Sequence, residues 1–196
     1  HLESTSKQSL QNLLKAVSMM SRYSLKSLSR LLSKLISRDR FNQQSRPLTE
    51  GECELARSVF GDSLHLQDVR LKTAWWVLKN YAVSPNGHIY FHPDNWLDDF
   101  SKAALGKQSW LIHELTHVWQ WQQGLKVVRG ALVNRRYAYE LKAGKSFFRY
   151  GIEQQARMVQ DYFIRRKLGK DCNDLEECIP FLTVATEQIK PSKGIN

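Results

Sequence analysis

The stretch LIHELTHVWQWQQG, residues 111–124, restricts what this chain can fold into more than any other feature. It places His113 and His117 four residues apart, with Glu114 beside the first histidine. Residues four apart lie on the same face of an α-helix, one turn above the other. The apolar neighbours Leu111, Ile112, Leu115 and Val118 would bury one side of that helix. We therefore predict a rigid helix from about residue 108 to Gly124.

The spacing of the two histidines suits a metal ion. Two imidazoles placed in this way can hold one Zn²⁺ at about 2.0–2.1 Å each. Glu114 can then reach a zinc-bound water, whose pKa the metal lowers towards about 7, and take its proton as general base. The motif predicts a hydrolytic site with one zinc ion per chain. The alternative is a half-buried helix whose histidines are merely hydrogen-bonded.

A catalytic zinc needs a third protein ligand and an open position for water. The candidates are Glu140, Glu153, Asp161, His88 and His92. Glu153 is preferred, because it lies beside Ile152 on the apolar face of a helix predicted over residues 146–168. A carboxylate that points inward is costly unless it meets a cation. Glu140 is the second choice, and the two histidines are expected to line a strand above the site.

The other patterns predict a small sheet followed by helices, which is the α+β class. A capping box formed by Thr49 and Glu52 starts a helix that ends at Gly61. Residues 64–71 and 75–83 are rich in aromatic and branched residues and are predicted as strands. Asn86-Gly87 predicts a hairpin that returns through residues 88–91. A short final helix is predicted to be capped by Asn173, three residues before Glu176.

Residues 1–46 differ from the rest of the chain and are predicted as a separate segment ahead of a domain over residues 47–196. They hold eleven serines, nine Lys/Arg and two acidic residues. This segment therefore carries most of the net charge of +10 of the whole chain. Leucines at gaps of three and four, and a basic residue every fourth position from 22 to 38, predict a basic amphipathic helix. Such a helix can lie on an anionic membrane, bind nucleic acid, or simply pack on a protein.

Composition restricts the remaining possibilities. With 42% hydrophobic residues and six tryptophans, the chain can bury a core without disulfides. Its three cysteines, Cys53, Cys172 and Cys178, are predicted to be thiols, with a Cys172–Cys178 pair as the alternative. No run of about 18 apolar residues is present, so no transmembrane helix is expected. The near-neutral balance of residues 47–196 counts against nucleic acid as the partner of that domain.

Four motifs occur together in one order: LTEGECELARSVFGDSL, SPNGHIYFHP, LIHELTHVWQWQQG and YGIEQQARMVQDYF. Over about residues 47–168 the chain thereby resembles a family of bacterial HExxH zinc metallopeptidase effector domains. These domains are found at the C-termini of type VI secretion spike (VgrG-like) proteins and Rhs proteins. The resemblance implies a zincin-like fold of the gluzincin type, with His113, His117 and Glu153 on zinc and Glu114 as base. Residues 1–46 lie outside it.

The resemblance also implies a toxin that is delivered by a secretion machine and acts in the target cell, in the periplasm or the cytoplasm. Expected partners are a protein or peptide substrate, a cognate immunity protein, and a secretion spike or adaptor. The strand His88 to Phe91, including Tyr90, would border the cleft as an edge strand that pairs with substrate. Tyr137, Tyr139 or Tyr150 could donate a hydrogen bond to the oxyanion.

Two other functions remain open from the sequence. The domain could be a binding module that keeps a zincin scaffold without turnover, although the presence of Glu114 argues against this. The chain could also act mainly as a membrane or nucleic-acid binder through residues 1–46.

Overall fold

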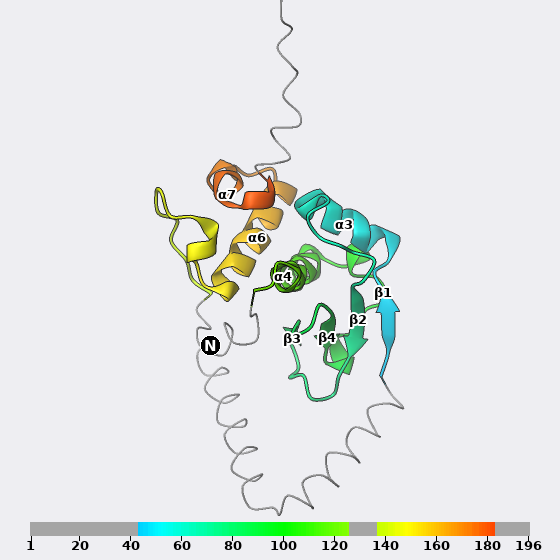
Figure 1. Ribbon diagram of the computed structural model, residues 1–196. Helices are drawn as coiled ribbons and strands as arrows, with labels where there is room; N and C mark the ends of the chain where they lie inside the picture. The colour runs from blue at the N-terminus through cyan, green and yellow to red at the C-terminus, as the bar shows by residue number, and fades with distance from the viewer. Residues whose placement is uncertain (1–42, 126–136, 183–196) are drawn as a thin grey trace, which may run out of the picture. The chain divides into compact units, whose positions relative to one another are not determined.

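The computed structural model of the protein describes residues 43–125 and 137–182 (Figure 1). These ranges contain helices α3 (Glu50–Phe60), α4 (Leu105–Gln122), α6 (Ile152–Lys167) and α7 (Asn173–Cys178), strands β1 (Ser45–Pro47), β2 (Arg70–Thr73), β3 (Ala82–Val83) and β4 (Ile89–Phe91), and 3-10 helices at Pro93–Asn95, Phe100–Lys102 and Phe147–Arg149. The predicted α+β class is confirmed. No helix in these ranges is long and apolar enough to span a bilayer. The predicted amphipathic helix falls almost wholly on residues 1–42, outside the described residues.

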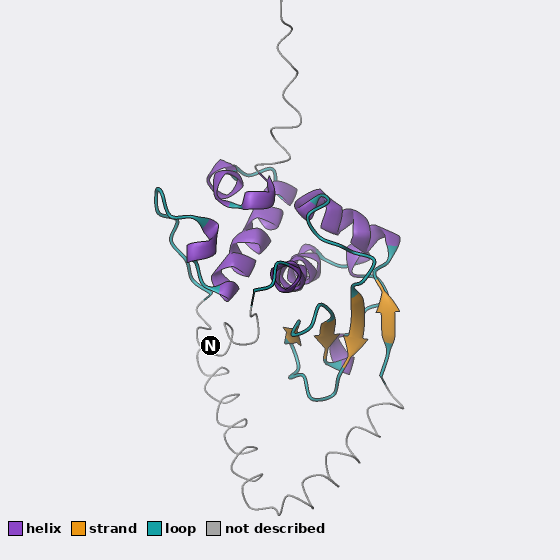
Figure 2. Ribbon diagram, in the orientation of Figure 1, coloured by secondary structure: helices purple, strands orange, loops and turns teal. Residues whose placement is uncertain are grey.

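The four strands form one mixed sheet in the order β1-β2-β4-β3 (Figure 2). β1 pairs antiparallel with β2, β2 runs parallel to β4, and β3 pairs antiparallel with β4. The hairpin predicted at Asn86-Gly87 therefore exists, since β3 and β4 flank it, and Gly87 has the positive φ of 80° that the turn requires. A Cβ at Gly87 would lie 2.7 Å from the ring of Trp121, so the turn packs directly against the end of α4.

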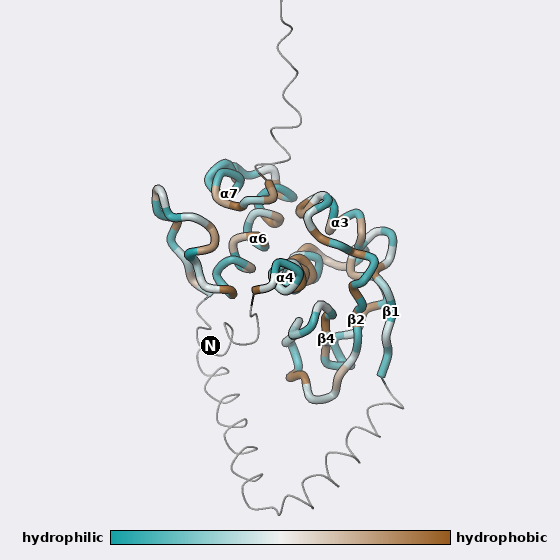
Figure 3. The backbone as a smooth tube through the Cα atoms, in the orientation of Figure 1, coloured by the Kyte–Doolittle hydropathy of each residue, from teal (hydrophilic) through white to brown (hydrophobic). Residues whose placement is uncertain are grey.

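Helix α4 is the central element, with the sheet on one side and α3, α6 and α7 around the other (Figure 1). Its apolar residues Leu111, Ile112, Leu115 and Val118 are completely buried. Burial of each stabilises the fold by about 1.5–3 kcal/mol relative to exposure. Parts of β2 and β4 are apolar along the backbone (Figure 3), and their residues Leu71, Ile89 and Phe91 belong to the same buried core as the apolar residues of α4. Trp119 is buried and Trp121 is half exposed, so the two tryptophans face different sides of the helix.

The strand predictions for residues 64–71 and 75–83 were largely wrong. β2 begins only at Arg70, and β3 covers only Ala82–Val83. Between them the chain turns, with the amide of Val77 donating to the carbonyl of Ala74, and Asn80 adopts a positive φ of 63°. The aromatic residues that suggested a strand are Trp75 and Trp76, and both are about half exposed. Their β propensity is overridden because the turn places them at the surface.

The helix predicted over residues 146–168 is divided in two. Phe147–Arg149 forms a 3-10 turn, Tyr150 and Gly151 are extended, and α6 starts at Ile152. The tertiary hydrogen bonds that Tyr150 makes hold this break. It has a functional consequence, because it places Glu153 in the first turn of α6.

The capping box of α3 is present as predicted, with the Thr49 hydroxyl accepting from the amide of Glu52. Glu52 is completely buried and also accepts two hydrogen bonds of 2.7 Å from the guanidinium of Arg46, and one from the amide of Phe100. Arg46 belongs to β1, so the strand that crosses the predicted 46/47 boundary is part of the sheet. The compact unit starts at Gln44.

The C-terminal helix and the thiols complete the described chain. α7 starts at Asn173, so the cap position is Cys172, whose side chain makes no capping hydrogen bond. The predicted capping by Asn173 is therefore wrong. Cys53, Cys172 and Cys178 are all free and half buried, so the prediction of thiols rather than a Cys172–Cys178 pair is confirmed. Burial raises the pKa of each thiol, which makes the thiolate scarce at neutral pH.

Candidate metal centre

Helix α4 presents His113 and His117 on one face, as the four-residue spacing requires. Both side chains are buried, and their rings lie 4.9 Å apart at an interplanar angle of 83°. Glu114, also buried, lies beside them on the same helix. The helix is continuous from Leu105 to Gln122, so its backbone hydrogen bonds fix the spacing of these three side chains.

Glu153 reaches the two histidines from helix α6. Its Oε2 lies 3.4 Å from Nε2 of His113 and 3.3 Å from Nε2 of His117. One ligand atom from each of the three residues lies within 4.8 Å of the others. The other candidates lie elsewhere: Glu140 is exposed, Asp161 binds Arg157 and Tyr139, and His92 caps the 3-10 turn at Asp94. The structure thus brings together the three residues that the sequence favoured.

The distances fit a tetrahedral metal site. For ligands at about 2.0–2.1 Å from a zinc ion, tetrahedral angles place neighbouring ligand atoms about 3.3 Å apart. The two distances from Glu153 Oε2 match this value. Two imidazoles and one carboxylate also form a donor set that zinc uses in hydrolytic enzymes. His113, His117 and Glu153 could therefore hold one such ion.

Electrostatics within the cluster favour a cation. Burial would raise the pKa of Glu153, but the hydrogen bonds and positive charge of His113 and His117 hold it well below its usual range. Burial would lower the pKa of His117, but Glu153 and Glu114 raise it above its usual value. An ionised carboxylate is thus kept in a buried position, and it needs positive charge beside it.

Glu114 has a partner that the sequence did not reveal. The hydroxyl of Ser84 donates a hydrogen bond of 2.9 Å to Oε2 of Glu114, and both groups are buried. Ser84 directly follows the edge strand β3. This contact spans thirty positions of sequence and depends on how the sheet packs on α4, so no local pattern could have predicted it. One acceptor position of the carboxylate is thereby fixed.

Gln120 is a second residue that the sequence analysis missed. Its Oε1 lies 2.8 Å from Nδ1 of His117, and the side chain is completely buried. The residue lies three positions after His117, and residues three apart on a helix are neighbours. The spacing was therefore a signal that could have been used.

The strand His88 to Phe91 is not the edge of the sheet, contrary to the sequence prediction. β4 lies between β2 and β3, so the edge on this side is β3. Tyr90 packs its ring against Trp76 and accepts a hydrogen bond from Asn86. Burial, together with Lys72 and Arg70, lowers the pKa of His88. β3, rather than β4, is therefore the strand at this edge of the sheet.

The three tyrosines that the sequence offers as hydrogen-bond donors to an oxyanion lie at different distances from the histidines. Tyr139 donates to Asp161, and its pKa is raised by burial and by the negative charge of that residue. The hydroxyl of Tyr150 donates to the carbonyl of Glu140 and accepts from the amide of Lys142. The ring of Tyr137 lies 6.1 Å from that of His113. Tyr137 is therefore the member of this group that lies beside the cluster of His113, His117 and Glu153.

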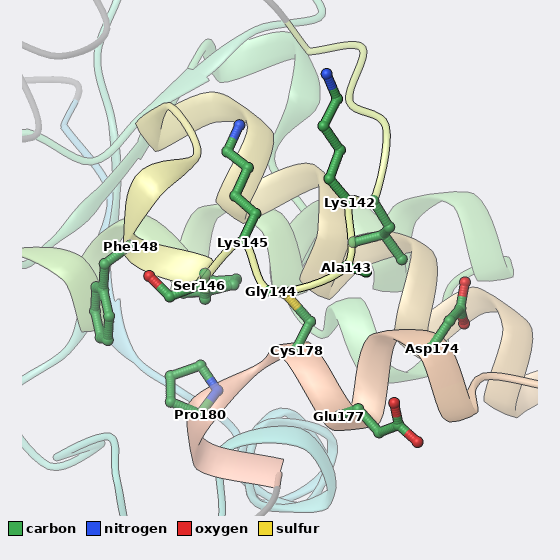
Figure 4. Close-up of a pocket in the computed structure, with 12 residues that line it drawn as sticks. Lys142, Ala143, Gly144, Lys145, Ser146, Phe148, Asp174, Glu177, Cys178 and Pro180 are labelled. Carbon is green, nitrogen blue, oxygen red and sulfur yellow. The ribbon is translucent and has the colours of Figure 1, made fainter.

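Two cavities are lined by residues between Tyr137 and Pro180. One of about 620 Å³ is lined by the loop from Leu141 to Phe148 and by α7, with Cys178 facing Gly144 (Figure 4). The other, of about 600 Å³, is lined by Tyr137, Tyr139 and the polar face of α6. Neither includes His113, His117 or Glu153 among its lining residues. Only the second comes near the cluster, through Tyr137.

Comparison with known proteins gives a consistent picture. No protein-family model matches the sequence. The type VI secretion system spike protein VgrG2b of Pseudomonas aeruginosa is 42% identical over 63% of this chain, which spans 13% of that protein's length. The solved structure of the effector domain of Pseudomonas aeruginosa VgrG2b is similar to this chain with a TM-score of 0.60 and 34% identity. That similarity covers 78% of this chain and 94% of the effector domain.

Proposed function

This chain belongs to the family of the VgrG2b effector domain of type VI secretion, and from that premise we propose that it is a zinc-dependent endopeptidase. The observation that carries the proposal is the arrangement of His113, His117 and Glu153 at tetrahedral spacing, with Glu114 on the same helix. The helix that bears the motif, packed between a small mixed sheet and α6, is also what a zincin-like fold of the gluzincin type would require.

The roles of the residues follow from their chemistry. His113, His117 and Glu153 would hold the zinc ion. Zinc, when bound, supplies a Lewis acid that lowers the pKa of water and polarises a carbonyl group. Glu114 would accept the proton of the attacking water and return it to the amine that leaves, as a general base and then a general acid. The Ser84 hydroxyl occupies one acceptor position of Glu114 and so directs the remaining lone pairs.

The substrate proposed is an extended peptide or protein segment. β3 is an edge strand of the sheet, and its next residue, Ser84, contacts Glu114. A peptide that pairs with β3 would therefore pass close to the general base. Tyr137, whose ring lies beside His113, is our candidate for donating a hydrogen bond to the developing oxyanion. The delivered protein would act in the target cell, in the periplasm or cytoplasm, and partners would be a spike or adaptor and a cognate immunity protein.

The proposal is tested with zinc-loaded protein and denatured casein, with fragments identified by mass spectrometry. Wild type should cleave it, and Glu114→Ala should bind one zinc per chain yet lose at least about 10²-fold in rate, because only the base is removed. Glu140→Ala serves as the matched control, since Glu140 is exposed and away from the cluster.

Two results would contradict the proposal. A wild-type protein that binds zinc but cleaves neither casein nor any protein in an N-terminal proteomic comparison of target cells would be a binding module. A Glu114→Ala variant as active as wild type would exclude the hydrolytic mechanism.

A further inference from the structure

A chain of buried amides connects His117 to the backbone of the neighbouring helix. Gln120 Oε1 lies 2.8 Å from Nδ1 of His117, and Gln120 Nε2 donates to the carbonyl of Ile152 at 3.0 Å and to Oε1 of Gln155 at 2.9 Å. Gln155 Nε2 then donates to the carbonyl of Tyr150 at 2.8 Å. Both glutamines are almost completely buried. The chain thus ends on two backbone carbonyls at the start of α6.

The two carbonyls fix the direction of every hydrogen bond in this chain. A carbonyl oxygen only accepts, so the group that faces Tyr150 must be the amide nitrogen of Gln155. Its oxygen then faces Gln120 and must receive a proton from that side chain. Gln120 Nε2 also donates to Ile152, so the oxygen of Gln120 faces His117. The Nδ1 of His117 must therefore be a donor.

The same logic excludes the reversed orientation. Turning the Gln120 amide over would place its oxygen against the carbonyl of Ile152 and the oxygen of Gln155. Turning over Gln155 as well would place its oxygen against the carbonyl of Tyr150. Either arrangement leaves buried acceptors facing each other, and an unsatisfied buried polar group costs about 1–3 kcal/mol.

We propose that Gln120 is a positioning residue for the metal site: through the Gln155 chain it holds the proton of His117 on Nδ1 and so leaves Nε2 as the lone pair that faces Glu153. The inference rests on the proposed zinc site. A neutral His117 in this tautomer directs its lone pair at a carboxylate oxygen 3.3 Å away, and a zinc ion between the two atoms would relieve that contact. Because an amide cannot ionise in the accessible pH range, this orientation does not change with pH.

This series of hydrogen bonds has a second effect, because it connects α4, which bears the two histidines, to α6, which bears Glu153. Gln120 lies on the histidine helix, whereas Ile152 precedes Glu153 directly on α6. The hydrogen bond between them therefore sets the distance from His117 to Glu153. Outer-shell partners of this kind change metal affinity by about 10–100-fold when they are removed.

The test compares Gln120→Met and Gln155→Met with Gln160→Met as control. Methionine keeps an unbranched side chain of similar size, and Gln160 lies on α6 with a single 3.3 Å hydrogen bond to Ser109. Two quantities are measured on the full chain: zinc affinity, by competition with a chromogenic chelator, and the tautomer of His117. The tautomer is read from long-range ¹H–¹⁵N correlations of metal-free protein above the pH at which the imidazole titrates.

In the wild type the proton of neutral His117 should be on Nδ1, although free imidazole side chains prefer Nε2. Gln120→Met should move it to Nε2 and weaken zinc binding by about 10–100-fold. Gln155→Met should produce smaller changes in the same direction, and Gln160→Met should produce none. If Gln120→Met fails to fold, the shift in Gln155→Met decides the question.

Two results would overturn the inference: a wild-type His117 protonated on Nε2, or a Gln120→Met variant with unchanged tautomer and zinc affinity. Failure of the proposed function is distinguishable. A wild type that binds no zinc, but whose tautomer still depends on Gln120, would refute the zinc site while supporting the positioning role.

Discussion

Glu153 is the residue on which the proposed metal site would most depend, because it is the proposed ligand that comes from outside the motif. Its place in the cluster follows from two properties: it lies beside the apolar face of α6, and α6 packs along the histidine helix. Glu140 has neither property, since it lies in an exposed segment without regular structure. The two carboxylates are thus a natural pair for testing which one binds metal.

Glu153→Ala should weaken zinc binding by more than the roughly 10–100-fold typical of outer-shell partners, because two histidines alone form a poor cage. Glu140→Ala should bind zinc as the wild type does. Both affinities can be measured by chelator competition at constant pH. The assignment would be reversed by a Glu153→Ala protein of unchanged affinity together with a Glu140→Ala protein that loses the metal.

The site residues differ in how far the sequence predicted them. His113, Glu114 and His117 could be identified because the four-residue spacing is a property of the helix itself. Glu153 required only the amphipathic pattern of a second helix. Ser84 could not be found, because its contact with Glu114 exists only after the sheet has packed on α4. Contacts of this kind depend on tertiary structure, and local spacing contains no information about them.

At the scale of elements, β1 contributes more than its three residues suggest. It brings Arg46 to Glu52, a completely buried carboxylate that also accepts from the amides of Thr49 and Phe100. The sequence placed the domain boundary at Arg46-Pro47 because proline disfavours helix in the preceding residue. That argument is valid for a helix end, but an extended edge strand tolerates proline equally well.

A fragment of residues 44–196 should therefore be more stable than a fragment of residues 47–196. The shorter one lacks Arg46 and leaves the charge of Glu52 buried without its partner, a loss of about 3–5 kcal/mol. Urea unfolding followed by circular dichroism measures the difference. Arg46→Met in the whole chain should move the midpoint in the same direction, whereas Arg70→Met, which removes exposed contacts with Ser45, should not. Equal midpoints for the two fragments would show that β1 is dispensable.

Helices were predicted more accurately than strands for a physical reason. α3 and α4 have apolar residues at helical spacing, and α3 has its own cap, so each is specified locally. The strands are two to four residues long and depend on neighbours for their hydrogen bonds. Residues 75–80 have strand-like side chains, yet no neighbouring strand is available to pair with them in the described structure.

At the scale of the whole molecule, the proposed metal site would join two helices that otherwise meet through apolar packing and a few side-chain hydrogen bonds, such as those of Gln120. α4 supplies two ligands and α6 one, and no backbone hydrogen bond between secondary-structure elements links these ligands directly. A metal ion there would bind only the folded state. Its binding energy would then add to the stability of the fold.

Removing zinc with a chelator should lower the melting temperature, and adding zinc should restore it. At a free zinc concentration about 1,000 times Kd the stabilisation is about 4 kcal/mol, which corresponds to about 8–16 °C for a chain of this size. Differential scanning fluorimetry is sufficient for the measurement. His113→Ala should show no response to chelator or zinc. A wild type whose melting temperature is the same in both conditions would be inconsistent with a metal that bridges α4 and α6.

The extended backbone at Tyr150-Gly151, which interrupts the helical structure before α6, has an electrostatic consequence. Because α6 starts at Ile152, Glu153 is its second residue and lies where the amides of a helix start have no intrahelical acceptor. The potential there is positive, equivalent to about half an elementary charge. A helix that began at residue 146 would have placed Glu153 in its interior, where this field has faded. The break therefore gives the carboxylate a favourable field of its own, before any ligand arrives.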